Sequence, residues 1–409
     1  MCATLTIAQN RKICDRGAPF WEERIRYLRY CANTGASPGA LTVKRNELIW
    51  IARYLPENAP QGISIEQLHE MCKRRSLVHK GRTMTERMIV IARPWLIFLG
   101  WWRKPELKPH IYHQLLNEYI KWMRDEKGFT QSTIDGWKGV VNKFLLWCIK
   151  NCRSLHQLNP EDIDEYFINN TGRWNRKSIK SITGALRIFL RYSASHGLCP
   201  SCLPETIMSP RIYDQESLPS ALAWEDVRRL LSMTNTGKTN DIRNRAILML
   251  LSIYGLRRGE VAMLRLEDID WKEGKLHIFR LKRKQPQTYP LLPVIAEALS
   301  DYIEAVRPQS SERIIFLGLN APHRPLTAGA YYDIVSKNFN KLEINIKHRG
   351  PHALRHTCAV KLLSQGFTLK EIGDHLGHRC TETTMIYAKV DLEKLREVGS
   401  FDLGELSCK

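Results

Sequence analysis

Several residues near the C-terminus have the side-chain types needed to react with a phosphodiester without a metal ion. The segment "HALRH" places His352 and Arg355 three positions apart, so they lie on one face if the segment is helical. Farther along, "LGHRCTETTMIY" contains His378 and, nine residues later, Tyr387. A tyrosine hydroxyl can attack phosphorus and form a covalent link, and a histidine can accept its proton near neutral pH.

Two further basic positions lie upstream of this segment. "YGLRRGEV" places Arg257 at a turn between two predicted helices, and "RLKRKQ" places Lys282 at the end of a predicted strand. Two arginines can hold the non-bridging oxygens of a phosphate through paired contacts, and a lysine near the leaving oxygen can donate a proton. Arg258 competes with Arg257, although the Gly-Leu-Arg register favours Arg257. Arg283 and Lys284 could each replace Lys282, because the register of a turn can slip.

The residues around these positions predict a helix-rich domain with one small antiparallel sheet. Residues 241–256 have helical spacing, and residues 275–293 alternate as a strand, a basic turn and a second strand. Five more helices are predicted at "VIAEALSDYIEAV", "AGAYYDIVSKNFNKL", "PHALRHTCAVKLLSQG", "TLKEIGDHLG" and "TETTMIYAKV".

The first half of the chain contains two stretches with the same pattern. Residues 20–55 and 112–151 each pair two helices around a turn, and each stretch is followed by a short acidic helix and an apolar, aromatic-rich helix. We interpret this pattern as a tandem duplication of one four-helix module. Proline-rich segments separate the blocks and predict three domains, at residues 1–103, 104–213 and 214–409.

The composition indicates a folded protein with a polyanionic partner. The 409 residues are 43% hydrophobic and 25% charged, with 62 Lys and Arg against 42 Asp and Glu. The basic residues are spread along the chain, which favours domains that bind a duplex over a basic tail. We expect no membrane span and no signal peptide. The 11 cysteines have no regular framework and fit free thiols in the cytoplasm.

No cofactor or metal site is predicted. "HGLCPSC" contains Cys199 and Cys202 at the spacing of a zinc-binding pair. A zinc site needs four convergent ligands, and the sequence supplies no second clean pair. We therefore expect these cysteines to bind no metal.

Taken together, the series Arg, Lys, His-x-x-Arg, His and Tyr resembles the tyrosine recombinase (phage integrase) family. "YGLRRGEVAML" is similar to the first arginine box of that family, and "PHALRHTCAVKLLSQGFTLKEIGDHLGHRCTETTMIYAKV" is similar to its second box and nucleophile. The resemblance covers roughly residues 110–400. It implies helical SAM-like core-binding modules followed by a tyrosine recombinase catalytic domain.

The resemblance also implies how the site treats a phosphate. Arg257 and Arg355 would form the phosphate clamp, and His378 would hydrogen-bond the phosphate. Glu260 matches the carboxylate of the first box and would orient a clamp residue.

The remaining roles concern proton transfer and attack. The resemblance implies that Tyr387 is the nucleophile, which forms a 3′-phosphotyrosyl bond and frees a 5′-hydroxyl. Lys282 would be the general acid for the 5′-oxygen, and His352 would be the general base. By contrast, His356 and His375 are interpreted as structural or surface residues.

The implied function is site-specific DNA recombination for a mobile element, by integration, excision or transposition. Two protomers would bind one core site, and two such dimers would form a tetramer on double-stranded DNA in the cytoplasm, at the nucleoid; a partner recombinase is left open. Residues 391–409 would dock on an adjacent protomer. The alternatives are a type IB topoisomerase-like enzyme and a non-catalytic DNA-binding regulator of the same fold.

Overall fold

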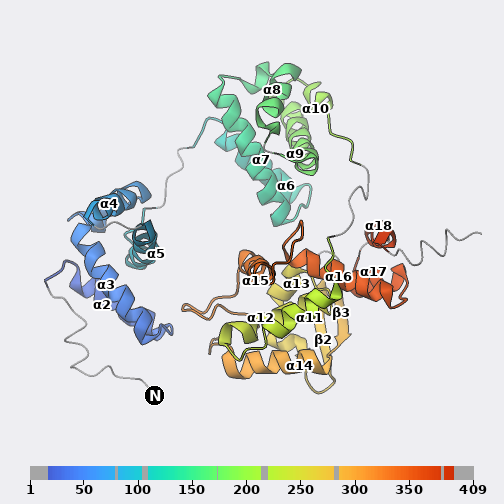
Figure 1. Ribbon diagram of the computed structural model, residues 1–409. Helices are drawn as coiled ribbons and strands as arrows, with labels where there is room; N and C mark the ends of the chain where they lie inside the picture. Colours follow the sequence, from blue (N-terminus) through green and yellow to red (C-terminus); the bar gives the residue numbers. More distant parts are fainter. Residues whose placement is uncertain are drawn as a thin grey trace, which may run out of the picture. The chain divides into compact units, whose positions relative to one another are not determined.

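The computed structural model describes residues 17–78, 82–103, 109–172, 174–212, 220–280, 285–378 and 382–390. Within these residues the chain forms three parts, each with its own hydrophobic core (Figure 1). Residues Pro105–Glu216 form a compact unit separate from the remainder of the chain. The predicted fold class, mainly helical with one small antiparallel sheet, is confirmed. The domain boundaries at residues 103 and 213 stay predictions.

The first part is a small helical bundle. Its core includes Leu48, Ile51 and Trp95, none of which is exposed. No helix of the described residues is long and apolar enough to cross a membrane. The elements are α2 (Trp21–Asn33), α3 (Pro38–Tyr54), the 3₁₀ turn η1 (Ala59–Gln61), α4 (Ile65–Val78) and α5 (Arg82–Leu99).

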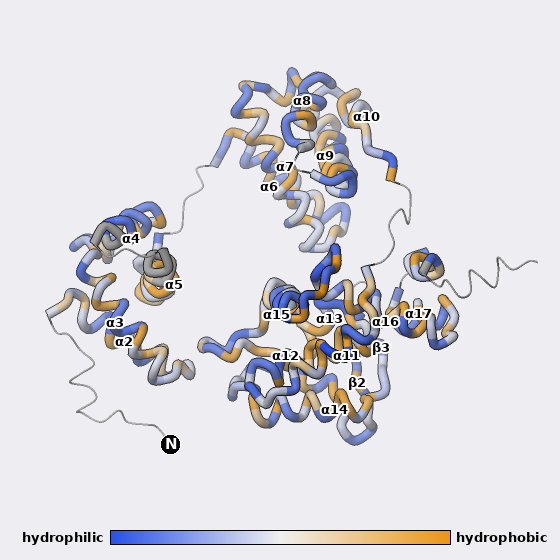
Figure 2. The backbone as a smooth tube through the Cα atoms, in the orientation of Figure 1, coloured by the Kyte–Doolittle hydropathy of each residue, from blue (hydrophilic) through white to orange (hydrophobic). Residues whose placement is uncertain are grey.

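The second part repeats that order of elements. Hydrophobic and hydrophilic residues alternate along its helices, as expected for amphipathic helices around a core (Figure 2). The elements are α6 (His113–Asp125), α7 (Gln131–Lys150), η2 (Leu155–Gln157), α8 (Pro160–Thr171), α9 (Arg176–Ser195) and α10 (Leu203–Thr206). Two helices, a 3₁₀ turn and two more helices therefore occur in both parts, and the tandem duplication stays a prediction.

The third part contains the predicted chemistry and the sheet. Its sheet has the antiparallel order β1-β2-β3, with Leu276 opposite Tyr289 and Ile278 opposite Gln287. The elements are α11 (Trp224–Met233), α12 (Thr239–Ser252), α13 (Arg258–Met263), η3 (Leu266–Asp268), β1 (Ile269–Asp270), β2 (Lys275–Arg280), β3 (Gln285–Pro290), α14 (Pro293–Ser300), the π-helical η4 (Asp301–Val306), α15 (Ala328–Lys341), α16 (Pro351–Ser364), α17 (Leu369–Leu376), α18 (Glu382–Met385) and η5 (Ala388–Val390).

Two local features of this part position the candidate site. Helix α12 is buried on all sides from Ala246 to Ser252, and the chain then turns at Gly255 with φ +59°. Glycine adopts this left-handed conformation without steric cost, and the turn leads directly to Arg257 at the start of α13. The single helix expected over residues 381–390 is not continuous, because Tyr387 lies between α18 and η5. Its backbone N–H donates to Thr384, three residues back, which tightens the last turn.

Candidate active site

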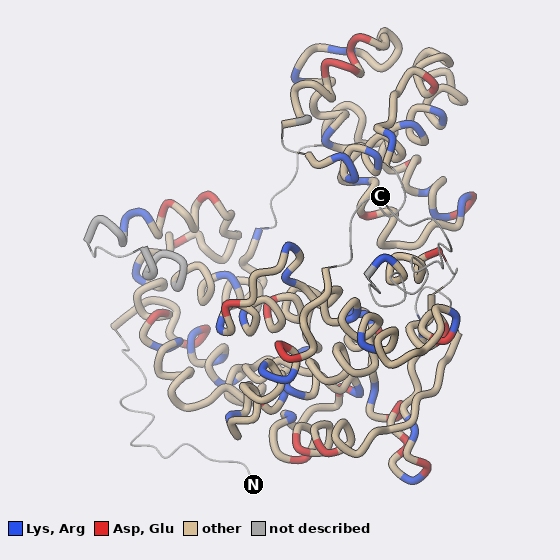
Figure 3. The backbone as a smooth tube through the Cα atoms, turned by 45° about the vertical axis from the view of Figure 1, so that its right-hand side comes forward, with Lys and Arg blue, Asp and Glu red and all other residues tan. Residues whose placement is uncertain are grey.

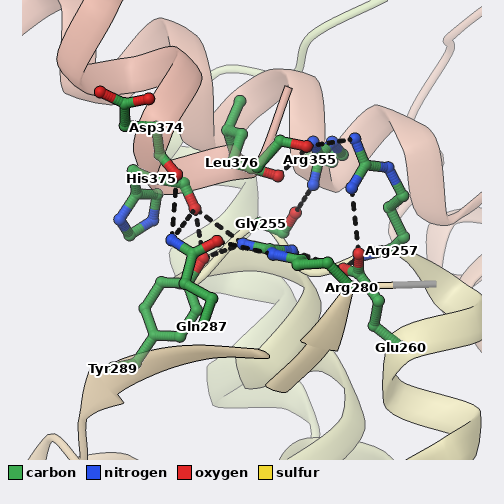
Figure 4. Close-up of polar contacts among 11 residues, drawn as sticks. Gly255, Arg257, Glu260, Arg280, Gln287, Tyr289, Arg355, Asp374, His375 and Leu376 are labelled. Carbon is green, nitrogen blue, oxygen red and sulfur yellow. Dashed lines mark hydrogen bonds and ion pairs between the residues drawn. The ribbon is translucent and has the colours of Figure 1, made fainter. Parts of the chain in front are cut away.

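The two predicted clamp arginines converge from different helices (Figure 4). Arg257 precedes α13; its Nη1 is 3.0 Å from Glu260 Oε1, and its backbone N–H donates to the other oxygen of Glu260. Arg355 is on α16 and only 3% exposed. Its Nη1 donates to the carbonyl of Gly255 at 2.6 Å, so the turn before Arg257 also holds Arg355. Glu260, which the sequence assigns to orientation, therefore directly contacts one clamp residue.

The C-terminal end of α17 fixes both clamp arginines. Arg355 Nη2 donates to the carbonyl of Leu376 at 2.7 Å, and Arg257 Nη2 donates to that of Gly377 at 3.0 Å. The last carbonyls of a helix have no partner within the helix and carry the negative end of its dipole. Cations are therefore favoured here, and the turn also delivers His378 to the site.

Tyr387 is buried beside the clamp. Its side chain is 1% exposed and packs in a cluster with Cys358, Ala359 and Leu376. The pKa of Tyr387 is raised to about 12, by burial first and to a smaller extent by Cys358, although Arg355 and Arg257 act in the opposite direction. Both guanidinium groups are thus close enough to favour the phenolate.

His356, which the sequence interpretation set aside, contacts the Tyr387 hydroxyl. Its Nδ1 is 2.9 Å from that oxygen, and the two rings are 5.7 Å apart. His352, the predicted base, is on the exposed side of α16, with its ring centroid 6.4 Å from that of His356. The spacing of the two histidines, one helical turn apart, places both on the same side of α16 but does not tell which one meets the tyrosine.

His378 lies on the other side of Tyr387. It is 6% exposed, its Nδ1 is 2.7 Å from Thr384 Oγ1, and its ring is 6.4 Å from that of Tyr387. Burial, Arg355 and Arg257 together lower the pKa of His378 to about 3. A neutral imidazole can still donate a hydrogen bond to a phosphate oxygen.

The structure does not describe one predicted residue, and it adds one residue that the sequence analysis did not select. Lys282 lies outside the described residues, as do its alternatives Arg283 and Lys284. Arg280, at the end of β2, was not selected from the sequence, yet it is 1% exposed and its Nη1 is 2.6 Å from Glu260 Oε2. The signal was present, because Arg280 occupies the buried position of a strand that otherwise alternates apolar residues inward.

A metal site and the cysteine pair Cys199 and Cys202 are the other possibilities that the sequence raises. No group of three or more histidine, cysteine or acidic side chains among them could hold a metal ion. Cys199 is buried and Cys202 is exposed, and both are free. Arg280 and Arg355 are buried in the site and Arg257 is partly exposed, and the buried carboxylate of Glu260 binds Arg257 and Arg280.

Comparison with known proteins gives the family. The model of the phage integrase family matches residues 221–394, a span that includes every candidate residue. The chain is 34% identical over 291 residues to the integrase/recombinase y4rA of Sinorhizobium fredii (strain NBRC 101917 / NGR234), covering 70% of each chain. The chain belongs to the phage integrase family of tyrosine recombinases. It is therefore a tyrosine-type site-specific DNA recombinase.

A further relative and a solved structure are also similar to the chain. The recombinase is 28% identical over 289 residues to tyrosine recombinase XerD of Staphylococcus saprophyticus subsp. saprophyticus, covering 69% of this chain and 96% of XerD. A solved lambda integrase dimer bound to a COC′ core site shares its fold, with a TM-score of 0.54 at 16% identity over 72% of this chain and 99% of that chain.

The buried His378 and the partly buried His356 predict that the recombinase loses stability in acid. The pKa of His356 is lowered to about 4, by burial first and then by His352 and Arg355, and that of His378 to about 3. In the unfolded chain both groups titrate near 6.5. As pH falls below about 6.5, the unfolded state binds protons that the folded state does not bind, so the free energy of unfolding decreases.

At about 1.4 kcal/mol per pKa unit, acidification from pH 7 to 4.5 should cost on the order of 3–5 kcal/mol. Calorimetric unfolding at both pH values measures this loss. His378→Asn cannot take up the proton, so this variant should lose clearly less stability on acidification. An equal loss in wild type and His378→Asn would contradict the assignment of acid sensitivity to this histidine.

Proposed function

We propose that the recombinase cleaves DNA by attack of the Tyr387 hydroxyl on a scissile phosphodiester. The oxygen of Tyr387 bonds to phosphorus, and the bond between phosphorus and the 5′-oxygen breaks. The products are a 3′-phosphotyrosyl link and a free 5′-hydroxyl, and attack by a 5′-hydroxyl of another strand reverses the reaction. The recombinase would use this exchange to move a mobile element, by integration, excision or transposition.

One observation carries the proposal: positive charge exceeds negative charge beside the Tyr387 hydroxyl, where Arg355 and Arg257 both act on it. Arg257 and Arg280 share the carboxylate of Glu260, whereas Arg355 binds two backbone carbonyls. Burial together with the charge of Arg257 lowers the pKa of Arg355 to about 10. A phosphate would supply the missing negative charge. Because charge grows on its oxygens in the transition state, fixed cations stabilise that state more than the ground state.

Proton transfer completes the step in both directions. The proton of the Tyr387 hydroxyl passes to a histidine, and the 5′-oxygen takes a proton from Lys282. His352 is the proposed base, and the proposed role of His378 is a hydrogen bond to the phosphate. His356 also contacts the hydroxyl, and the tautomer of its ring sets the direction of that hydrogen bond.

The burial of Tyr387 implies that DNA binding rearranges the segment that carries it. A hydroxyl in a side chain that is 1% exposed cannot meet a phosphate bound at the surface. Within the described residues 382–390, the four-residue α18 and the three-residue η5 flank Tyr387, so few backbone hydrogen bonds of this segment oppose such a movement. We propose that the bound duplex exposes the hydroxyl to the clamp.

The charge distribution supports a DNA duplex as the partner. Lys and Arg occur on all three parts of the chain, which carries a formal net charge of +20 (Figure 3). We propose that two protomers occupy each core site, as in the lambda integrase complex, and that two such dimers form a tetrameric synapse. Residues 391–409, which lie outside the described residues, would dock on an adjacent protomer.

Covalent trapping tests the proposed chemistry. Wild-type protein is incubated with a nicked, randomised duplex pool, and adducts are recovered from a denaturing gel. We expect one DNA-linked peptide, which contains Tyr387, and an unchanged yield in EDTA. Cleavage that leaves no adduct and stops in EDTA would contradict the proposal, as would an adduct on another residue.

A further inference from the structure

Arg280 is the most heavily bonded side chain of the site (Figure 4). Its Nη1 contacts Glu260 Oε2 at 2.6 Å, its Nε donates to Gln287 Oε1 at 2.8 Å, and its Nη2 donates to the carbonyl of His375 at 2.8 Å. Its Nη2 also contacts the Tyr289 hydroxyl, and its guanidinium carbon is 5.4 Å from the centre of that ring. The side chains of Arg280 and Glu260 are each 1% exposed.

Three arginines bind three successive carbonyls at the end of α17. Arg280 donates to residue 375, Arg355 to residue 376 and Arg257 to residue 377. The backbone is fitted to this arrangement at Gly377, where φ is +66° and an added Cβ would lie 2.6 Å from Arg280 Nε. The same turn therefore orients both clamp arginines and Arg280.

Burying an arginine at this position costs desolvation free energy, which interactions of its charge must offset. Leu276 and Ile278 occupy the equivalent inward positions of β2, and an apolar residue at 280 would continue their packing. Arg280 instead brings a desolvated charge close to Arg355, whose pKa it lowers. The compensating interaction is with Glu260, because one carboxylate oxygen binds Arg280 and the other binds Arg257 Nη1.

We propose that Arg280 is a positioning residue of the phosphate clamp. It holds Glu260 in the orientation that directs Arg257, and it holds the α17 terminus in the orientation that directs Arg355. Four of the five N–H groups of Arg280 bind partners within the described part of the protein, so we assign Arg280 to positioning and not to contact with the phosphate. This proposal rests on the proposed function, since it assumes that Arg257 and Arg355 bind the scissile phosphate.

The dependence of the attachment rate on the charge of the phosphate distinguishes a positioning role of Arg280 from a purely structural one. A methylphosphonate at the scissile position replaces one non-bridging oxygen by a methyl group and removes the negative charge. A correctly oriented clamp matters less for this neutral group. The defect of a variant whose clamp is misdirected should therefore shrink on methylphosphonate, whereas a general folding defect should be the same on both substrates.

The experiment measures the single-turnover rate of covalent attachment to a nicked duplex. The duplex contains the DNA site that wild-type protein selects, and its scissile position is either a phosphodiester or a methylphosphonate. Arg280→Met should be slower by about 10²-fold on the phosphodiester and by less than about tenfold on methylphosphonate. Arg280→Lys keeps the charge but cannot span Glu260 and His375 together, so it should show the same selectivity with a smaller defect. This second variant also serves if Arg280→Met does not fold.

Arg307→Met is the matched control. Arg307 likewise anchors backbone carbonyls of the third part, including those of Ile314 and Ile315. Within the described part of the chain it bonds to none of the site residues, so its loss should slow attachment to neither substrate. Equal defects of the Arg280 variants on both substrates, or no defect, would overturn the proposal. A wild-type protein that attaches to neither substrate would instead overturn the proposed function, and this proposal with it.

Discussion

Tyr387→Phe is expected to abolish covalent attachment to DNA and to leave DNA binding intact. Phenylalanine retains the ring that packs against Cys358, Ala359 and Leu376, so the surrounding core should persist. The change removes the proposed nucleophile and its hydrogen bond to His356, which costs about 1 kcal/mol of stability. Denaturing gels measure the adduct, and mobility shifts measure binding to the same duplex.

Tyr331→Phe is the control for loss of a buried hydroxyl. Tyr331 is fully buried in α15, and its hydroxyl has no hydrogen-bond partner among the described residues. That variant should attach to DNA at the wild-type rate. Attachment by Tyr387→Phe at a comparable rate would show that another residue is the nucleophile.

The positions of the candidate residues along the chain were predictable because each occurs in a local pattern. Arg257 follows a buried apolar helix and a glycine, and the glycine does adopt the positive φ that a sharp turn requires. Arg355 is within a strongly predicted helix. Their mutual placement was not derivable from periodicity, since the two arginines are joined through Gly255, Leu376 and Gly377.

A sequence does not show where backbone carbonyls lie in the fold, so it could not predict the contacts of the three arginines with the end of α17. The three carbonyls that bind arginines follow from the end of α17, and any sequence that ends a helix there would present similar groups. Arg280 was detectable in principle as a charged residue at an inward strand position. His356 was not, because whether it or His352 meets Tyr387 depends on how residues 382–390 pack against α16.

The first part of the chain illustrates a different limit. Its helices were predictable from apolar spacing, and the structure contains four helices and a 3₁₀ turn in the described residues of this part. The family match, however, begins at residue 221, so it assigns no role to this part. Apolar periodicity specifies which faces pack together and says nothing about which DNA or protein surface the opposite faces contact.

Arg355→Met is expected to slow covalent attachment by about 10²–10³-fold, because it removes a fixed cation from the oxygens of the phosphate. Methionine also leaves the carbonyls of Gly255 and Leu376 without their donors, at a cost of about 1–3 kcal/mol. Rates are therefore compared below the unfolding temperature of the variant, which circular dichroism establishes. Arg355→Lys should remain slow as well, since one ammonium group cannot replace a guanidinium that binds two carbonyls and, in the proposed clamp, a phosphate.

The pH dependence of attachment distinguishes loss of the clamp from loss of the fold. The positive charge of Arg355 lowers the pKa of Tyr387, so its removal should raise that pKa further. The rate of Arg355→Met should consequently keep rising to higher pH than the wild-type rate does. A folding defect would lower the rate by the same factor at every pH at which both proteins are folded. A wild-type rate for Arg355→Lys, or parallel pH profiles for Arg355→Met and wild type, would contradict a clamp in which Arg355 acts on both the phosphate and the nucleophile.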